Sequence, residues 1–248
     1  MTITLTVLGS SGTWASKDSA CSGYLIDDGT TRIWLDCGPG TLQALQNHTT
    51  LDKLDALVVS HEHPDHCLEL PVVRNALKYG LGLDGLPLIS PRGVLDVLDR
   101  LVGERGVAPP FRPRVVADGS TTTVGTLQLT FHRTDHPVET LAVRIDPVGG
   151  DPAFVYSADT GPDWSLSSVG DGIGLALVEG TSLASEEGGD LPHISARQAG
   201  EAARAAGAAK LVLTHVPPTH DPETHRLEAE AAFGAPVQLA IPHESYEV

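Results

Sequence analysis

Aromatic and basic residues are scarce in this 248-residue sequence. Phe, Trp and Tyr make up 4% of the chain, so no platform for stacking nucleobases is obvious; Trp14, Tyr24 and Trp164 are the candidates. Sixteen Lys and Arg residues stand against 32 Asp and Glu residues, which gives a formal net charge of −16. Because nucleic-acid affinity comes largely from basic side chains that neutralise phosphates, this balance argues against a long nucleic-acid footprint.

Paired cysteines and long apolar runs are also missing. Cys21, Cys37 and Cys67 are odd in number and have no paired spacing, which favours free thiols in a reducing compartment. No run approaches the 18 apolar residues of a membrane span. Residues 1–8 alternate apolar and polar side chains, unlike a signal peptide, which has a basic start and a continuous apolar stretch. We therefore expect a cytoplasmic protein without a membrane segment.

The chain does have apolar residues for a substantial core, at 41%, and its 26 glycines and 18 prolines indicate many turns. β-rich runs predict strands at 3–8, 23–26, 32–35, 56–60, 127–131, 142–145, 153–157, 175–178, 210–214 and 237–240. Helices are predicted at 40–47, 66–79, 91–102 and 196–206. The most linker-like stretch, 109–118, is too short to separate domains. We expect one mixed α/β domain over residues 1–248.

Capping signals define two of the expected helices. Ser90 followed by Pro91 predicts an N-cap and a proline at the first helical position. Ser195 and Gln198 match a capping box, and Gly207 supplies the stop of the same helix.

The strongest functional pattern is the segment His61-Glu-His-Pro-Asp-His66, which directly follows an apolar strand. Residues i and i+2 at a strand end point the same way, so His61 and His63 can share one metal ion. Asp65 and His66 turn into the following helix and can serve a second ion. Imidazole combined with carboxylate favours zinc, with manganese or iron as alternatives.

Three further candidate ligands occur in equivalent settings. His136, Asp159 and His215 each follow a hydrophobic strand and have a proline close behind them. Loops at strand ends commonly carry the chemistry of sheet proteins. Asp159 is the best candidate for a carboxylate between the two ions, and His132 is a rival to His136. Among the other histidines, His48, His220 and His225 are expected to be exposed.

At these residues the chain resembles the metallo-β-lactamase superfamily, whose mark is a His-x-His-x-Asp-His loop. The resemblance implies a four-layer αββα sandwich with two divalent metal ions at one edge, between the sheets. It further implies that His61, His63 and His136 hold one ion. Asp65, His66 and His215 would hold the other, and Asp159 would be shared.

Within that superfamily the chain is similar to the tRNA 3′-processing nucleases and cyclic-nucleotide phosphodiesterases. The similarity lies in short motifs spread over the chain, at 8–13, 35–41, 136–140, 156–160 and 213–218. The segments 190–218 and 241–248 look particularly like actinobacterial cyclic-nucleotide phosphodiesterases. Homodimers are common among these proteins, although no residue here indicates one.

The resemblance also implies catalytic roles. His193 lies 22 positions before His215, where the nucleases keep a proton-donating histidine. Glu179 matches the glutamate of their His-Glu-Ala-Thr segment and would steady His193, although Val178 replaces the preceding histidine. Asp65 would orient or deprotonate the attacking water, and Asp36 would orient a ligand histidine.

One departure from the nucleases bears on the substrate. Many of them carry a long tRNA-binding arm between the third histidine and the shared aspartate, but here only 23 positions separate His136 from Asp159. We therefore expect a small-molecule phosphodiester as substrate, a 3′,5′-cyclic nucleotide that yields the 5′-monophosphate. An endoribonuclease that processes tRNA 3′ ends is the first alternative. A lactone, thioester or β-lactam hydrolase, a redox diiron protein and a non-catalytic metal-binding protein are the others.

Overall fold

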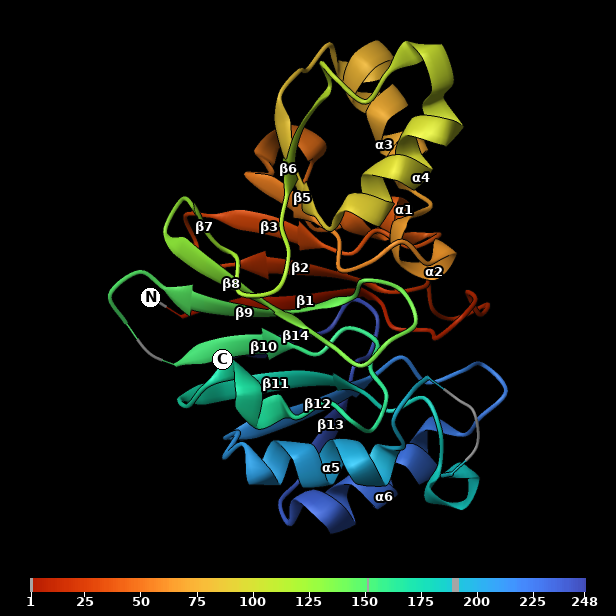
Figure 1. The fold of residues 1–248 in the computed structure, drawn as a ribbon, viewed down its shortest axis with the longest axis vertical. Helices are drawn as coiled ribbons and strands as arrows, with labels where there is room; N and C mark the ends of the chain where they lie inside the picture. The colour runs from red at the N-terminus through yellow and green to blue at the C-terminus, as the bar shows by residue number, and fades with distance from the viewer. Residues whose placement is uncertain (1, 151, 189–191) are drawn as a thin grey trace.

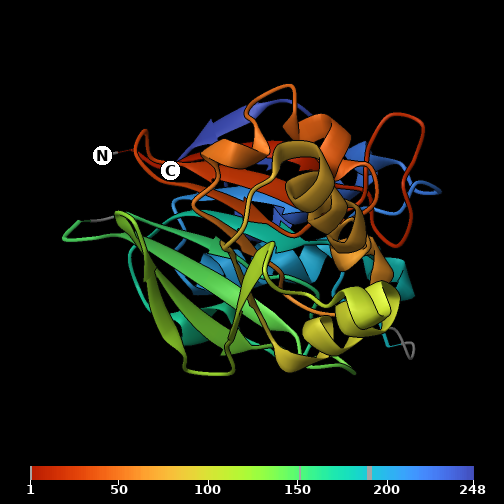
Figure 2. The same cartoon turned by 90° about the horizontal axis from the view of Figure 1, so that it is seen from above.

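The computed structural model describes residues 2–150, 152–188 and 192–248. Its strands form two seven-stranded sheets that lie face to face, and helices pack on the outer side of each (Figure 1). Figure 2 shows the same layers from above. The expected four-layer αββα sandwich is confirmed. No helix among the described residues has the length and apolarity that crossing a membrane requires.

The N-terminal sheet has the order β14-β1-β2-β3-β4-β5-β6. Its strands β14, β1, β2 and β3 pair antiparallel, whereas β3, β4, β5 and β6 pair parallel. The strands are β1 (Thr4–Gly9), β2 (Gly23–Asp27), β3 (Arg32–Leu35), β4 (Ala56–Val58), β5 (Leu86–Ser90), β6 (Phe111–Val115) and β14 (Ser245–Glu247).

The C-terminal sheet has the order β7-β8-β9-β10-β11-β12-β13. It is antiparallel from β7 to β10 and parallel from β10 to β13. The strands are β7 (Thr121–Val124), β8 (Leu127–Arg133), β9 (Leu141–Pro147), β10 (Ala153–Tyr156), β11 (Ile173–Glu179), β12 (Lys210–Thr214) and β13 (Val237–Leu239).

Helices cover the outer face of each sheet. On the N-terminal sheet lie α1 (Thr41–Leu45), α2 (Pro64–Cys67), α3 (Leu70–Asn75) and α4 (Arg92–Val102), with the short 3₁₀ helices η1 (Leu51–Lys53) and η3 (Gly103–Arg105) and the π-helix η2 (Ala76–Leu81). On the C-terminal sheet lie α5 (Ala196–Ala205) and α6 (Pro222–Phe233), with η4 (Leu166–Val169) and η5 (Ala184–Glu186).

Burial on both faces explains the continuous apolar runs of the central strands. On β11, Leu175 and Leu177 point into the core between the sheets, while Ala176 and Val178 pack toward α5 and α6. Strands covered on both sides have no solvent face and so need no alternation of polar residues. The inter-sheet core thereby fixes the strand ends, which carry the candidate site.

Several elements differ from the sequence prediction. Residues 109–118 are not a linker, because they contain β6, an edge strand whose last four residues, including Pro113, are exposed. Proline is tolerated at a sheet edge, and the exposure removes the alternation that predicts a strand. The strands β5, β7 and β14 and the helix α6 were also unpredicted, and the predicted helix 66–79 is divided between α2, α3 and η2.

The two predicted caps have different outcomes. Ser195 caps α5 in a capping box with Gln198, and Gly207 follows the helix with φ +66°, as expected. Ser90 is not an N-cap. It ends β5, and Pro91 precedes α4 without any side-chain cap.

His225 is wholly buried in α6, so the expectation that it is exposed is wrong. Its Nδ1 donates to the carbonyl of Gly180 at 2.7 Å, and its Nε2 lies 3.0 Å from His220 Nδ1. Burial lowers the pKa of His225 below its usual 6.5, with the adjacent His220 acting in the same direction. The folded protein therefore keeps this ring neutral where the unfolded chain protonates it.

This burial predicts an acid-sensitive contribution to stability. Because the unfolded state binds the extra proton, the contribution is complete above pH 6.5 and declines as the pH falls below that value. Urea unfolding at pH 7.5 and 5.5 should show a smaller loss on acidification for His225→Gln, which keeps a donor for Gly180, than for the wild type. Equal losses in both proteins would refute the assignment.

Candidate metal centre

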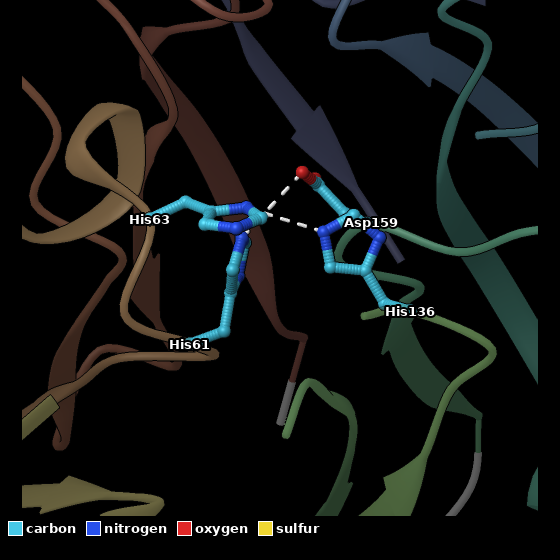
Figure 3. A group of neighbouring side chains, drawn as sticks. All are labelled: His61, His63, His136 and Asp159. Carbon is cyan, nitrogen blue, oxygen red and sulfur yellow. Dashed lines mark hydrogen bonds and ion pairs between the residues drawn. The ribbon is translucent and has the colours of Figure 1, made fainter. Parts of the chain in front are cut away.

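The seven predicted ligands converge at one edge of the sandwich, where strands of both sheets end. From the N-terminal sheet, the β4–α2 loop and α2 contribute His61, His63, Asp65 and His66. From the C-terminal sheet, the loops after β8, β10 and β12 contribute His136, Asp159 and His215. Figure 3 shows His61 and His63 facing His136 and Asp159.

The donor atoms form the two groups that the sequence predicts. Those of His61, His63, His136 and Asp159 lie within 4.8 Å of one another, and so do those of Asp65, His66 and His215. In the first group, His136 Nε2 is 3.2 Å from His63 Nδ1. In the second, His215 Nε2 is 3.2 Å from Asp65 Oδ2 and 3.4 Å from His66 Nε2.

Asp159 faces both groups. Its Oδ2 lies 3.5 Å from His61 Nε2, and its Oδ1 lies 3.2 Å from His66 Nε2 and 3.6 Å from His215 Nε2. One carboxylate oxygen is thus directed at each group, which is the geometry expected of a shared ligand.

Four of the histidine rings are oriented by an acceptor at Nδ1. A metal-ligating histidine commonly donates its other N–H in this way, which fixes the tautomer and aims the free nitrogen at the metal. The contacts are His61 to Ser60 Oγ (3.0 Å), His66 to Asp36 Oδ2 (2.8 Å), His136 to Pro192 O (3.0 Å) and His215 to Thr181 Oγ1 (2.8 Å).

Asp36 is the centre of this supporting network. It is wholly buried and accepts from the Ser60 N–H at 2.7 Å, the Ser60 hydroxyl at 2.8 Å, His66 Nδ1 at 2.8 Å and the Tyr156 hydroxyl at 2.9 Å. A buried carboxylate with four donors is rigid. The structure therefore places Asp36 where the resemblance expects a residue that orients a ligand.

The chemistry of the cluster fits divalent cations. His61 Nε2 and Asp159 Oδ1 are buried without a hydrogen-bond partner in the described part of the chain, and such orphaned atoms are costly unless an ion satisfies them. Burial, reinforced by His66, lowers the pKa of His61 to about 4, which keeps its lone pair free. Burial alone would raise the pKa of Asp159, but His215, His66 and His61 hold it well below its usual range.

His193 and Glu179 lie beside the predicted ligands. His193 Nδ1 donates to Glu179 Oε1 at 3.0 Å, and Glu179 is 1% exposed. Burial would lower the pKa of His193, but the charge and hydrogen bond of Glu179, helped by Asp159, raise it to about 9. The donor atoms of Asp159, His193 and His215 also lie within 4.8 Å of one another, so the geometry alone would also allow His193 a ligand role.

A cavity of about 330 Å³ opens over these groups; it is lined by Thr13, His63, Pro64, Asp65, Asp159, His193 and His215. The backbone N–H of Thr13 donates to Asp65 Oδ2 at 2.9 Å. Tyr24 is wholly buried with its hydroxyl on Thr214, so it offers no stacking surface, whereas Trp14 is 47% exposed. His132 is half-buried on β8 and belongs to neither donor group.

Gly38, which follows strand β3, allows the segment that carries Asp65 and His66 to pack closely against it. A Cβ at this position would lie 1.9 Å from the backbone oxygen of Asp65, so an alanine must displace the segment that carries Asp65 and His66. We expect Gly38→Ala to weaken metal binding at least about tenfold, since small displacements of ligands are costly. Gly80→Ala, whose Cβ meets no atom within 4 Å, is the control. Unchanged metal affinity in Gly38→Ala would contradict the packing argument.

Comparison with known proteins identifies the family. Residues 31–216 match the model of the β-lactamase superfamily domain. The chain belongs to this superfamily. It is 34% identical to the uncharacterized protein ML1173 of Mycobacterium leprae, over 100% of this chain and 89% of that protein. It is 28% identical to the ribonuclease Z of Halorubrum lacusprofundi, over 94% of this chain and 93% of the relative.

A further β-lactamase superfamily relative is known both in sequence and in structure. The "Probable metallo-hydrolase YhfI" of Bacillus subtilis is 30% identical over 95% of this chain and 96% of its own length. The crystal structure of YhfI superposes with a TM-score of 0.90, covering all of both chains at 27% identity. The protein is thus a metallo-hydrolase of the β-lactamase superfamily, a fold that implies divalent metal ions, and its His/Asp cluster fits such a site.

Proposed function

We propose that the protein hydrolyses a small phosphodiester, a 3′,5′-cyclic nucleotide, to the 5′-monophosphate. The observation that carries the proposal is the pairing of a complete donor set with the His193–Glu179 pair at one cavity. A substrate with an anionic phosphodiester needs both cations and a proton donor for its leaving oxygen, and this cavity offers residues for both.

The donor groups support the ligand assignment that the resemblance implies. His61, His63 and His136 would hold one ion, Asp65, His66 and His215 would hold the other, and Asp159 would serve both. Zinc suits this mixture of imidazole and carboxylate, with manganese or iron as alternatives. Two bound divalent ions supply Lewis acidity, which lowers the pKa of water and neutralises charge on the phosphate.

The protein's own groups provide the remaining steps. Asp65 reaches the cavity and is held by Thr13 N–H and His215, so it can orient the attacking water. Water loses a proton to Asp65 as it forms a bond to phosphorus, and the P–O3′ bond breaks. His193, with its pKa raised to about 9, carries a proton at neutral pH and delivers it to O3′. Glu179 keeps the ring directed at the cavity by holding its Nδ1–H.

The segment between His136 and Asp159 supports a small substrate. Its described residues form β9, β10 and the turn between them, with no room for a long RNA-binding arm. The net charge of −16 agrees, because an acidic protein repels a polyanion.

Product analysis with metal-loaded protein tests the proposal. Incubation with cyclic AMP and cyclic GMP should yield the 5′-monophosphates, as separated by chromatography, and chelation should stop the reaction. A yield no higher than that of an Asp159→Ala variant would refute it.

Similarity to ribonuclease Z supports a second candidate, endonucleolytic cleavage of precursor tRNA at its 3′ end. The same preparation should be given a precursor tRNA and a cyclic nucleotide in parallel. Cleavage of the RNA without turnover of the nucleotide would favour the nuclease.

A further inference from the structure

The hydroxyl of Thr181 lies between the two parts of the site. Thr181 Oγ1 is 2.5 Å from Glu179 Oε2 and 2.8 Å from His215 Nδ1. It is buried, and it directly follows Glu179 and Gly180 at the end of β11. The hydroxyl thus touches both the proposed metal ligand that it orients and the carboxylate that holds His193.

The direction of these hydrogen bonds follows from counting protons. When His215 binds a cation through Nε2, its remaining proton must sit on Nδ1, so Nδ1–H donates to Thr181 Oγ1. The single hydroxyl proton of Thr181 is then free to be donated to Glu179 Oε2. Glu179 accepts it and uses Oε1 for His193 Nδ1–H and for the Thr160 N–H at 2.7 Å.

We propose that Thr181 is a positioning residue that couples the orientation of the ligand His215 to that of Glu179 and His193. The contacts form a continuous series of hydrogen bonds from the proposed ligand His215 to the proposed proton donor His193. Each hydrogen bond in the series polarises the next. The catalytic half of this inference rests on the proposed function, whereas the metal-binding half does not.

The backbone around Thr181 is held in place, which lets a single hydroxyl act as a fixed link. The Gly180 N–H donates to Thr214 O at 3.0 Å, and the Gly180 carbonyl accepts from His225 Nδ1 at 2.7 Å. A Cβ at Gly180 would lie 2.6 Å from Leu213 Cδ1, so the segment packs closely on β12. A residue substituted for Thr181 therefore cannot shift to restore the lost contacts.

Metal affinity tests the link to His215 without any substrate. Thr181→Val keeps the shape but removes the hydroxyl, and competition with a chromophoric chelator for Zn²⁺ should show affinity about 10- to 100-fold lower. Thr181→Ser keeps the hydroxyl and should remain within about threefold of the wild type. Thr122→Val, which removes a buried hydroxyl without a partner in the described residues, is the matched control. Wild-type affinity in Thr181→Val, or equal losses in Val and Ser, would overturn the link.

Turnover at saturating Zn²⁺ tests the link to Glu179 and His193. With diphenyl phosphate as the probe, whose phenolate leaving group needs a proton far more than a nitrophenolate does, Thr181→Val should lower kcat about tenfold or more. KM should stay unchanged, because the substrate does not touch Thr181. In a His193→Ala background the same substitution should have no further effect on kcat. Full restoration of kcat by excess Zn²⁺, or additive losses in the double variant, would overturn the coupling. If the protein did not hydrolyse cyclic nucleotides, the Zn²⁺ affinity and the kcat with this probe could still be measured. The role of Thr181 and the proposed substrate can therefore fail separately.

Discussion

Replacing Asp159 with alanine is expected to lower turnover by about 1,000-fold or more and to reduce metal content below two ions per chain. The wild-type carboxylate directs one oxygen at each donor group, so both groups lose a ligand. The loss of several kcal/mol of charge stabilisation corresponds to a decrease of this size. Elemental analysis of unchelated protein, combined with turnover of a phosphodiester, measures both effects.

The control for this experiment is Asp163→Ala. Asp163 follows Asp159 in the same loop but is exposed and belongs to neither donor group. It should retain wild-type metal content and turnover. An Asp159→Ala protein with two ions and near-normal activity would remove Asp159 from the proposed site.

His193→Ala is expected to lower kcat by about 100- to 10,000-fold, the usual contribution of a positioned acid, while two ions remain bound. The reason is that Glu179, and no proposed metal ligand, holds Nδ1 of this ring. A substrate with a good leaving group, such as a nitrophenolate, should be much less affected, because it needs no proton at the leaving oxygen.

The metal content of His193→Ala distinguishes the role of proton donor from that of metal ligand, which the geometry also allows. Since a ring nitrogen of His193 lies within 4.8 Å of donor atoms of Asp159 and His215, loss of an ion in His193→Ala would make His193 a ligand. His132→Ala is the matched control, because this half-buried ring on β8 has no partner at Nε2 among the described residues. This substitution should leave the metal content and kcat unchanged.

The sequence singled out the residues that the structure brings together because their chemistry is local. The segment from His61 to His66 concentrates ligand types in six positions, and His136, Asp159 and His215 share the setting of an apolar strand followed by proline. The network behind them was predicted only at Asp36. Ser60, Pro192 and Thr181 act through one hydroxyl or carbonyl each, and no residue type marks a backbone carbonyl as an acceptor. For Thr181, its place two residues after Glu179 at a strand end was the available signal.

The fold was predicted where burial produces continuous apolar runs and was missed where it does not. The strands β10, β11 and β12 are buried on both faces and were identified from residue type alone. The edge strand β6 shows no alternation because only its first residue is buried, and β14 has just three residues, too few for a pattern to indicate a strand. In α6 only His225, Ala229 and Phe233 are buried, a stripe too narrow and too polar to indicate a helix.

The distribution of donors between the sheets has a consequence for how the protein matures. The N-terminal sheet side supplies His61, His63, Asp65 and His66, and each proposed ion draws the rest of its ligands from segments at least 70 positions later. A growing chain that has only its first half can offer two donors to each ion, too few to retain it against cellular chelators. With the proposed ligands, metal capture would thus follow the closure of the two sheets, and only correctly closed chains would acquire the cations.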